Sequence, residues 1–308
     1  MLTSALNSNV VKTALDNVFK QEFEYAMQPG HASAETAAIF KQDTADSSAV
    51  IMEVFKGVGY WDAKAELADI QNGTPRVTNQ ITFTVTEYAK SVDISKTFFD
   101  DNKHGVYEKM VRDMAESGRL TRDRNAFAVY RNAFTTSLTA DGITLCSDSH
   151  TTISGDTVDN KLTAALSESS LNDAIVALGE QKAQDGTIRG MQPATLLVPL
   201  ALYKTACTLV ESQLRASTAN NDMNVYSDKY GITVYTSPFL GAAAGGSDTM
   251  WFLLSRNHSV TRWVREAVHT ELIPFQYTRN NVYVYKAAFR EVVGAVDYSG
   301  VIGSTGTA

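Results

Sequence analysis

The chain has 308 residues, of which 44% are hydrophobic and 20% are charged, and its formal net charge is −7 at pH 7. These proportions are those of a folded globular protein and exclude a disordered one, because the apolar content is enough for one large core or two smaller ones. The 27 lysines and arginines are scattered along the chain, which argues against a surface that binds nucleic acid by neutralising phosphates.

The sequence carries no recognisable membrane or secretion signal. No apolar run approaches the roughly eighteen residues that a membrane-spanning helix needs, and the amphipathic N-terminus does not follow the pattern of a secretion signal. The two cysteines, Cys146 and Cys207, lie far apart without a CxxC spacing, which argues against a disulfide framework or a zinc cage. We therefore expect the chain in a reducing cytoplasm.

Residues 1–56 form a segment without a core of its own. The loop MQPGHASAET, a polar stretch and the apolar AVIMEVF follow a first segment with helical periodicity. Because so few apolar residues are available, we expect this segment to lie across another part of the same chain or a neighbouring chain. The residues that define the predicted amphipathic helix are Val10, Val11, Leu15, Val18 and Phe19.

From Tyr60 the pattern changes to alternating apolar and polar residues, which is typical of strands with one covered face. A turn signal in QNGTPRVTN separates two such runs, and the parity of the alternation changes near EYAK, as a bulge or sharp twist would produce. The sequence predicts a long hairpin with its tip at roughly residues 71–79. Its apolar residues are Trp61, Ala63, Ala65 and Leu67 in the first run, and Ile81, Phe83 and Val85 in the second, continuing at Val92 and Ile94.

A two-stranded ribbon of this kind is at best marginally stable by itself in water. It needs a third strand or a surface to pack against. The hairpin is therefore predicted either to fold back on its own domain or to reach another subunit.

One long helix is expected over residues 104–134. Gly118 is predicted to loosen or bend its middle, because glycine costs about 1 kcal/mol relative to alanine inside a helix. The acidic pair Asp100 and Asp101 precedes the helix, where carboxylates interact favourably with the helix dipole. A loop, TADGITLCSDSHTTISGDT, is expected after it. The helical spacing is carried by Val106, Met110, Met114, Phe127, Tyr130 and Phe134.

The C-terminal half alternates helical and extended patterns. Ser169 or Ser170 is predicted to cap a helix over SLNDAIVALGEQKA, and LALYKTACTLVESQL is a second amphipathic helix. ATLLVP, YGITVYTS, MWFLLS, SVTRWVRE, NNVYVYKAAF and REVVGAVDYSGVI are predicted strands. The fold class is therefore α+β with a mixed sheet. Trp61, Trp251 and Trp263 stand in apolar, strand-like contexts, so we expect them in the core or at a subunit contact.

The stretch LCSDSH places a thiol, a carboxylate and an imidazole at alternate positions, Cys146, Asp148 and His150. All three are metal-ligand types, but this loop supplies at most three ligands and no second cluster stands nearby in sequence. A Cys–His nucleophilic pair would also need an orienting group and an oxyanion hole. The favoured interpretation is a loop histidine and a small buried cysteine, with no metal and no cofactor.

The order of these parts carries a resemblance. The chain begins with an N-terminal arm, followed by the hairpin AELADIQNGTPRVTNQITFTVTEYAKSVDISKTFFDD. A long helix comes next, and then an α/β half that closes with strands. The chain thereby resembles the major capsid proteins of tailed bacteriophages with the HK97 fold, and DGITLCSDSH after the helix looks most like the Mu-type major head subunit. The resemblance implies five parts: an N-terminal arm (1–58), an extended loop hairpin (59–97), a peripheral domain with a spine helix (98–160), an axial α/β domain (161–258) and return strands to the peripheral domain (259–308).

The resemblance further implies a structural protein of the virion rather than an enzyme, with no catalytic, cofactor or metal residues. Copies would assemble in the bacterial host cytoplasm into hexamers and pentamers of an icosahedral shell, which encloses double-stranded DNA without sequence-specific binding and involves no membrane. The hairpin would lie over an adjacent subunit and the arm would cross another. The candidate intersubunit contacts are Trp61, Leu67, Pro75, Ile81, Phe83 and Val85.

Further partners follow from the same resemblance, namely portal and decoration proteins. Met1 lies too close to the arm for an N-terminal scaffolding segment, so a separate scaffold protein or an already processed chain is expected. Some members crosslink a loop lysine to an asparagine of a neighbour. Lys64 and Lys90 lie in or beside the loop here, and neither is assigned to such a crosslink.

Two alternatives remain open at this point. Encapsulin-type cellular shells share the fold and enclose cargo enzymes instead of DNA. The second alternative is a metal- or thiol-dependent hydrolase that uses Cys146, Asp148 and His150 and acts as a compact monomer or dimer.

Overall fold

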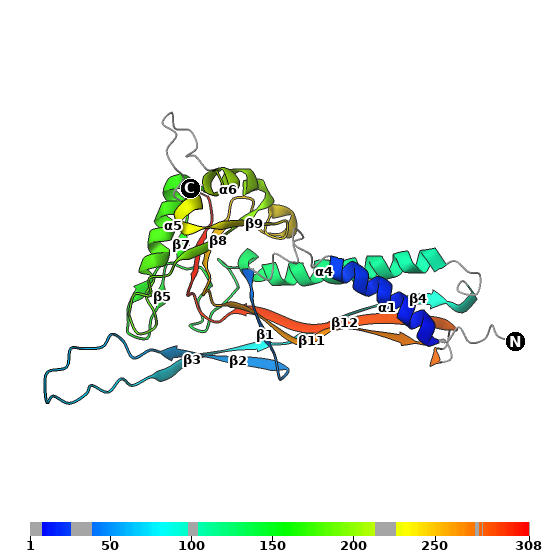
Figure 1. The fold of residues 1–308 in the computed structure, drawn as a ribbon, viewed down its shortest axis with the longest axis horizontal. Helices are drawn as coiled ribbons and strands as arrows, with labels where there is room; N and C mark the ends of the chain where they lie inside the picture. The colour runs from blue at the N-terminus through cyan, green and yellow to red at the C-terminus, as the bar shows by residue number, and fades with distance from the viewer. Residues whose placement is uncertain are drawn as a thin grey trace. The chain divides into compact units, whose positions relative to one another are not determined.

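The computed structural model describes residues 8–25, 39–97, 104–212, 226–274, 277–278 and 280–307 (Figure 1). The chain divides into two compact units. Both combine helices with β-sheet, so the predicted α+β class is confirmed. Unit 1 comprises Met1–Val50, Thr84–Ala126 and Arg262–Val292, and unit 2 comprises Ile51–Phe83, Phe127–Thr261 and Val293–Ala308.

Unit 1 is built on a four-stranded sheet in the order β1-β11-β12-β4. Strand β12 pairs antiparallel with β4 along its whole length, from Val282 opposite Ser95 to Glu291 opposite Thr86. A shift of this register by one residue would turn the buried Ile94 and Tyr285 away from the core, so the apolar pattern fixes the pairing. The elements are α1 (Ser8–Tyr25), β1 (Lys41–Thr44), β4 (Thr86–Ser95), α4 (His104–Arg131), β11 (Val260–Ile273) and β12 (Val282–Ala295).

The predicted long helix is confirmed as α4, which runs without a break through Gly118. Its buried residues recur at three- and four-residue spacing, so one stripe of the helix faces the sheet. This stripe joins residues of the sheet and of α1 in a single apolar cluster. The cluster consists of Leu15, Phe19, Ile94, Tyr107, Val111, Met114, Ala115, Leu272, Tyr283 and Tyr285.

The predicted N-terminal helix is confirmed as α1, and it packs on unit 1 of its own chain. Leu15 and Phe19 are buried there. Asp16 Oδ1 accepts hydrogen bonds from Thr270 Oγ1 at 2.6 Å and from Tyr285 Oη at 2.8 Å. Apolar and polar contacts therefore both hold this helix against the sheet.

The predicted hairpin exists, but its strands and its tip were placed wrongly. Strands β2 (Ala49–Lys56) and β3 (Arg76–Thr84) form a two-stranded sheet, and residues 57–75 between them contain no strand. The alternation from Trp61 to Leu67 therefore belongs to the loop, and the predicted tip at residues 71–79 covers the end of that loop and the start of β3. The predicted change in the alternation of apolar residues is confirmed. Strand β3 ends at Thr84, Val85 lies between the two strands, and β4 belongs to the four-stranded sheet.

Unit 2 contains a five-stranded mixed sheet in the order β7-β13-β10-β8-β9. Strand β10 is antiparallel to both β13 and β8, whereas β8 and β9 are parallel, as are β13 and β7. The strands are β7 (Lys161–Leu162), β8 (Pro193–Pro199), β9 (Thr233–Ser237), β10 (Trp251–Ser255) and β13 (Val301–Ser304). A separate small pair is formed by β5 (His150–Thr151) and β6 (Thr157–Val158).

Helices α5 (Glu168–Glu180) and α6 (Tyr203–Val210) pack on this sheet. The predicted cap of α5 was wrong by two or three residues. The N-cap is Ser167, whose side chain accepts from the backbone N–H of Ser170 while the Ser170 hydroxyl bonds the Ser167 backbone. This reciprocal capping box satisfies two backbone N–H donors. Ser170 therefore lies in the first turn of α5 as the partner of the N-cap, and is not the N-cap itself.

The tryptophans separate into two groups. Trp251 and Trp263 are buried, as predicted for core residues, and Trp251 Nε1 donates to the Ala164 carbonyl at 3.1 Å. Trp61 is 93% exposed. The two predicted strands at the C-terminal end are divided differently in the structure. VYVYKAAF and REVVGA form the single strand β12, and β13 is only Val301–Ser304.

Three expectations concern residues outside the described ranges, namely the loop MQPGHASAET, the acidic pair Asp100 and Asp101, and the last residues of the segment LALYKTACTLVESQL. Among the described helices, none is long and apolar enough to cross a membrane.

Candidate assembly surface

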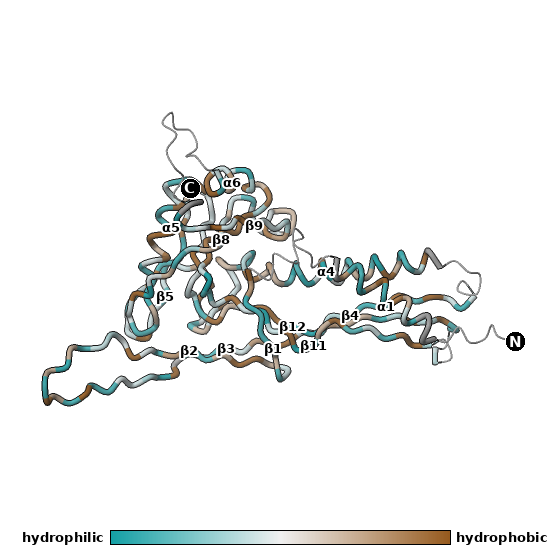
Figure 2. Tube along the Cα trace, viewed as in Figure 1, coloured by the Kyte–Doolittle hydropathy of each residue, from teal (hydrophilic) through white to brown (hydrophobic). Residues whose placement is uncertain are grey.

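The loop at residues 57–75 is the most exposed apolar segment that the structure describes in unit 2. Figure 1 shows it as two long limbs beyond β2 and β3, and Figure 2 shows hydrophobic residues on both limbs. Exposed fractions reach 93% for Trp61, 96% for Leu67 and 83% for Ile70. Covering each side chain of this size stabilises a protein by about 1.5–3 kcal/mol, so this segment would gain a large stabilisation from a partner surface.

The root of the loop is fixed to unit 2. Asp185 Oδ2 accepts a hydrogen bond from the backbone N–H of Gly59 at 3.2 Å, and the Tyr60 hydroxyl accepts one from the backbone N–H of Ile188 at 3.0 Å. A Cβ at Gly57 would lie 2.2 Å from Asp185 Oδ2, so a larger residue there would displace this carboxylate. The loop therefore projects from a defined anchor.

Asp185 is itself held in place. It accepts hydrogen bonds from the Thr187 hydroxyl at 2.6 Å and the Thr187 backbone N–H at 3.1 Å. Burial raises the pKa of Asp185, but these bonds and the bond from Gly59 together lower it by more, so the pKa of Asp185 lies below the ordinary value. The anchor is thus an ionised carboxylate at neutral pH.

A tight turn lies halfway along the loop. The backbone N–H of Ala68 donates to the carbonyl of Ala65 at 3.2 Å, and Leu67 adopts a left-handed backbone conformation with φ of 66°. A bulky residue rarely takes this conformation, which costs about 1–3 kcal/mol. The turn displays a strained and almost fully exposed leucine.

The six predicted contact residues have different environments. Trp61, Leu67 and Pro75 are exposed, and Ile81 and Phe83 are half-buried. Val85 is only 7% exposed, so its own chain already covers it. Sequence analysis did not single out Tyr60 and Ile70, which are 71% and 83% exposed; their signal was that both are large apolar residues outside the alternating set Trp61 to Leu67.

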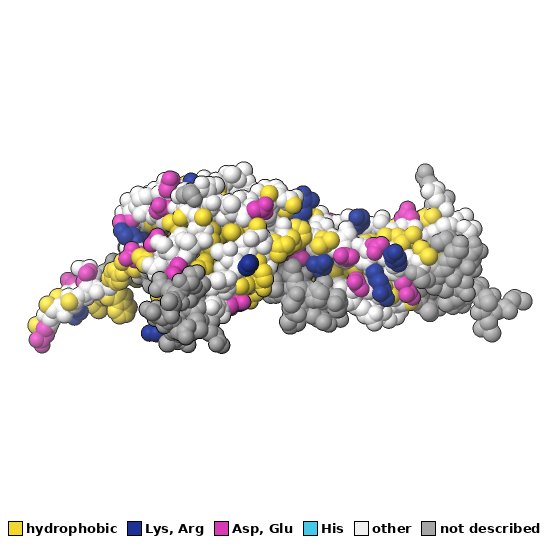
Figure 3. All heavy atoms as spheres, turned by 90° about the horizontal axis from the view of Figure 1, so that it is seen from above, with side chains coloured by type: hydrophobic (Ala, Val, Ile, Leu, Met, Phe, Trp, Pro, Cys, Tyr) yellow, Lys and Arg dark blue, Asp and Glu magenta, His cyan; other side chains and the backbone are white. Residues whose placement is uncertain are grey.

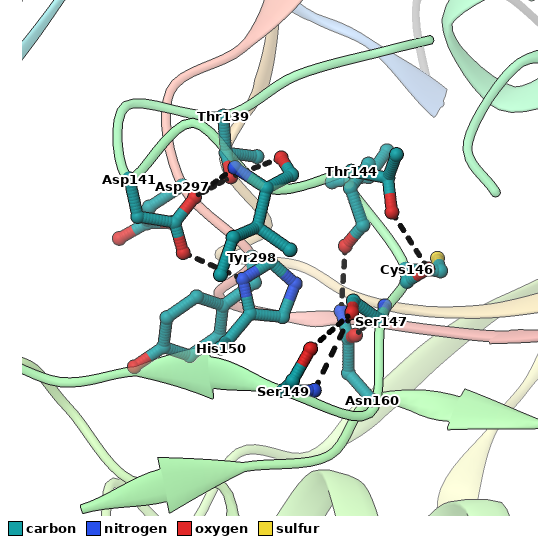
Figure 4. Close-up of polar contacts among 12 residues, drawn as sticks. Thr139, Asp141, Thr144, Cys146, Ser147, Ser149, His150, Asn160, Asp297 and Tyr298 are labelled. Atoms are coloured by element: carbon teal, nitrogen blue, oxygen red, sulfur yellow. Dashed lines mark hydrogen bonds and ion pairs between the residues drawn. The ribbon is translucent and has the colours of Figure 1, made fainter. Parts of the chain in front are cut away.

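The predicted Cys146, Asp148 and His150 do not form one site, and Cys146 and His150 have different partners in Figure 4. His150 is fully buried, with its Nδ1 2.7 Å from Asp141 Oδ2 and its ring centroid 4.6 Å from that of Tyr298. Asp148 is exposed. The partner of the histidine is therefore Asp141, which the sequence analysis did not name.

Cys146 has the environment of a structural cysteine. Its side chain is buried, and burial raises the pKa of its thiol far above the ordinary value, which nearby Lys161 only partly opposes. A protonated, buried thiol is a poor nucleophile and a poor metal ligand. Within the described ranges, no group of three or more His, Cys, Asp or Glu side chains could hold a metal ion.

Asn160, which is also buried, holds the segment around Cys146 in place. Its side-chain amide donates to the carbonyls of Leu145 and Val301 at 2.8 and 3.1 Å, and its Oδ1 accepts from the backbone N–H of Ser147 at 2.8 Å (Figure 4). These bonds join the loop before β5 to strand β13. The polar cluster at His150 and Asn160 thus has the features of a structural core.

Comparison with known protein families decides the assignment. The phage capsid protein family matches residues 78–304. The chain belongs to this family. Its function is therefore structural, as a component of the virion capsid, and not enzymatic.

The fold of this capsid protein recurs in solved shell structures. A chain of Microbacterium phage Oxtober96 is 13% identical with a TM-score of 0.55, covering 88% of this chain and 90% of that chain. The capsid of Ralstonia phage GP4 is 12% identical with a TM-score of 0.56, covering 86% of each chain. A virus-like particle from Pyrococcus furiosus is 9% identical with a TM-score of 0.52, covering 95% and 98%.

These likenesses confirm the predicted HK97-like fold of the capsid protein, with its long helix and mixed sheet. No curated protein sequence matches the chain significantly.

Proposed function

We propose that this chain is the major head subunit of a tailed phage, which self-assembles into the hexamers and pentamers of an icosahedral shell around double-stranded DNA. The observation that carries the proposal is the anchored loop at residues 57–75, which exposes Trp61, Leu67 and Ile70 almost fully. A loop that is held firmly at its root and bare along its limbs is suited to a surface on another copy.

The five-part division predicted from sequence is part of this proposal. In it, residues 1–58 are the arm, 59–97 the extended loop, 98–160 the peripheral domain, 161–258 the axial domain and 259–308 the return strands. The loop lies on an adjacent subunit through Trp61, Leu67 and Pro75, with Ile81 and Phe83 contributing from β3. Val85 is left out of the contact set because it is already buried.

Finer assignments rest on the sequence resemblance. DGITLCSDSH after α4 supports a Mu-type head subunit. Assembly takes place in the bacterial host cytoplasm, with portal, decoration and scaffold proteins as further partners and no membrane. The net charge of −7 supports a shell that contains DNA without binding specific sequences.

An encapsulin-type cellular shell is the second candidate, since a virus-like particle from Pyrococcus furiosus has the same fold. The match to the phage capsid protein family favours the phage head. Mass spectrometry of purified particles separates the two, because a phage head contains DNA and connector proteins and an encapsulin-type shell contains a cargo enzyme.

The first test is negative-stain electron microscopy with light scattering on the purified chain. Closed particles, tubes, or rings of five or six subunits are the expected result. A monomer of 33.6 kDa that persists at high concentration, both alone and with candidate scaffold proteins, contradicts the proposal.

The second test concerns the loop. Replacing residues 61–70 by a Gly-Ser linker of equal length should leave the circular dichroism and thermal unfolding of the subunit unchanged, because these residues have no buried side chain, but should prevent closed shells. Val176→Ala is the matched control, since Val176 is an exposed apolar residue on α5. Intact shells from the linker variant would show that the loop is not an intersubunit element.

A further inference from the structure

A hollow of about 610 Å³ lies at the ends of three strands of the five-stranded sheet of unit 2. The parallel strands β8 and β9 begin there, and the antiparallel β10 ends there. The segments that precede β8 and β9 and the turn that follows β10 therefore meet around the hollow. Its lining is Arg189, Gly190, Met191, Gln192, Pro193, Ala194, Lys229, Tyr230, Gly231, Ser255, Arg256 and Asn257.

The charge of this hollow is unusual for an acidic protein. Arg189, Lys229 and Arg256 are exposed cations, and the lining contains no carboxylate. Within the part of the chain that the structure describes, none of the three forms an ion pair. Met191 and Ala194, which are half-buried, add apolar surface to the lining. The hollow, which we call the basic hollow, is suited to a ligand that carries both carboxylates and apolar side chains.

The loop at residues 57–75 has the complementary composition. Its exposed stretch YWDAKAELADI carries three carboxylates and one lysine beside its large apolar residues. Figure 3 shows acidic and hydrophobic side chains next to one another along the loop at the left. In the sequence, Leu67 of the strained turn stands between Glu66 and Asp69, and all three residues are exposed, so acidic and apolar groups are displayed together.

The turn of the loop does not contact the basic hollow of its own chain in this structure. The root is bonded to Asp185 and Ile188, immediately before Arg189 of the basic hollow, and the loop extends away from it with Leu67 96% exposed. Each limb of about nine residues reaches roughly 30 Å. The turn of one chain is therefore placed to meet the basic hollow of another, in a head-to-tail contact of the type that closes rings.

We propose that the basic hollow of one copy binds the turn of the loop of a second copy, with Glu66 and Asp69 facing Arg189 and Arg256 and Leu67 covering Met191. This inference rests on the proposed shell function and adds the receptor for the loop. Nucleic acid phosphates are the competing occupant, but the hollow is wide and partly apolar, which fits a peptide turn better than a single phosphate group.

A charge-swap experiment tests the proposal. Arg189→Glu with Arg256→Glu, and separately Glu66→Lys with Asp69→Lys, should each reduce the assembled fraction at low salt at least tenfold, because like charges then face one another. The four changes combined should restore assembly to within about twofold of the natural chain. Lys204→Glu is the matched control, because Lys204 is an exposed cation on α6 outside the hollow.

Disulfide trapping supplies an independent readout that does not depend on closed shells. In a Cys207→Ser background, Glu66→Cys with Arg189→Cys and Asp69→Cys with Arg256→Cys are oxidised at high concentration. Because a disulfide needs Cα atoms within about 7 Å, a ladder of linked chains from either pair supports the contact. Variants with a single added cysteine should give dimers at most.

The outcomes separate this inference from the proposed function. Two outcomes overturn the contact and leave the shell function intact, provided that the natural chain forms shells. One is that neither cysteine pair gives a ladder, and the other is that the charge-reversed variants assemble as the natural chain does. Normal shells of the Arg189→Glu, Arg256→Glu variant that have lost nucleic acid overturn it in favour of phosphate binding. Absence of any assembly and of any ladder contradicts both.

Discussion

Arg262 on β11 and Glu291 on β12 form a buried, bidentate ion pair in unit 1. Arg262 Nε lies 2.9 Å from Glu291 Oε2, and Arg262 Nη2 lies 3.1 and 2.8 Å from Oε1 and Oε2. Both side chains are 3% exposed, and Arg122 Nε on α4 is 3.1 Å from the same carboxylate. One carboxylate therefore links two neighbouring strands to the long helix.

Removing one member of this group should be strongly destabilising. Arg262→Met leaves Glu291 buried with only Arg122 as a partner, and an incompletely compensated buried charge costs about 3–5 kcal/mol. We expect urea denaturation to report a loss in this range. Arg262→Met combined with Glu291→Leu should recover part of it, whereas a double variant no more stable than the single one would show that packing and not charge causes the loss.

The long helix and the buried strands of unit 2 were predictable because local pattern and burial agree there. In α4 the buried Met114, Phe127 and Tyr130 follow a helical period whatever surrounds them. The strand ATLLVP becomes the fully enclosed β8 for the same reason, since a short continuous apolar run between turn residues fits a strand covered on both faces. These elements needed no information from distant residues.

The loop could not be placed from sequence because its alternation is not caused by a sheet. Trp61 and Leu67 alternate with polar residues as strand residues do, yet they lie in a loop and face solvent. An extended chain gives the same period of two whether or not it is paired. The partner of His150 was missed for another reason: Asp141 lies in a separate turn, and only the fold brings the two side chains together.

Asp141 predicts a component of acid sensitivity. Burial raises the pKa of Asp141. Hydrogen bonds with His150, the Thr139 hydroxyl and the Ile143 backbone N–H lower this pKa by more, so it is depressed overall. A depressed pKa in the folded state gives stability that is present above the unfolded pKa of about 3.9 and is lost as the pH falls through the folded pKa. The free energy of unfolding should therefore fall more steeply below about pH 4 in the natural chain than in Asp141→Asn.

The control for this measurement is Asp148→Asn, which changes an exposed carboxylate of the same loop. Its pH profile should follow that of the natural chain. Equal slopes for all three proteins would show that Asp141 is not linked to folding.

The two cysteines should differ in reactivity. Cys146 is buried and burial raises the pKa of its thiol, whereas Cys207 on α6 is partly accessible. A thiol reagent should therefore modify one cysteine per folded chain and two after denaturation. The folded Cys207→Ser variant should be almost unreactive. Rapid labelling of Cys146 in the folded protein would contradict its structural role.

A pair of glycine substitutions separates the anchor of the loop from general effects of adding a methyl group. In Gly57→Ala the new Cβ would lie 2.2 Å from Asp185 Oδ2, so either this carboxylate or the root must shift, at a cost of about 1–3 kcal/mol. The bond from Gly59 to Asp185 should weaken, and limited proteolysis within residues 57–75 should become faster.

In Gly118→Ala the Cβ meets no atom within 4 Å, so this change inside α4 should stabilise the fold by about 0.5–1 kcal/mol. The two variants are compared by urea denaturation, by proteolysis and by particle yield. Only Gly57→Ala should lower the yield of closed particles, because only there does the loop leave unit 2 in a different direction. Equal yields would show that assembly tolerates a displaced root, and that the bonds of Asp185 stabilise the subunit without orienting the loop.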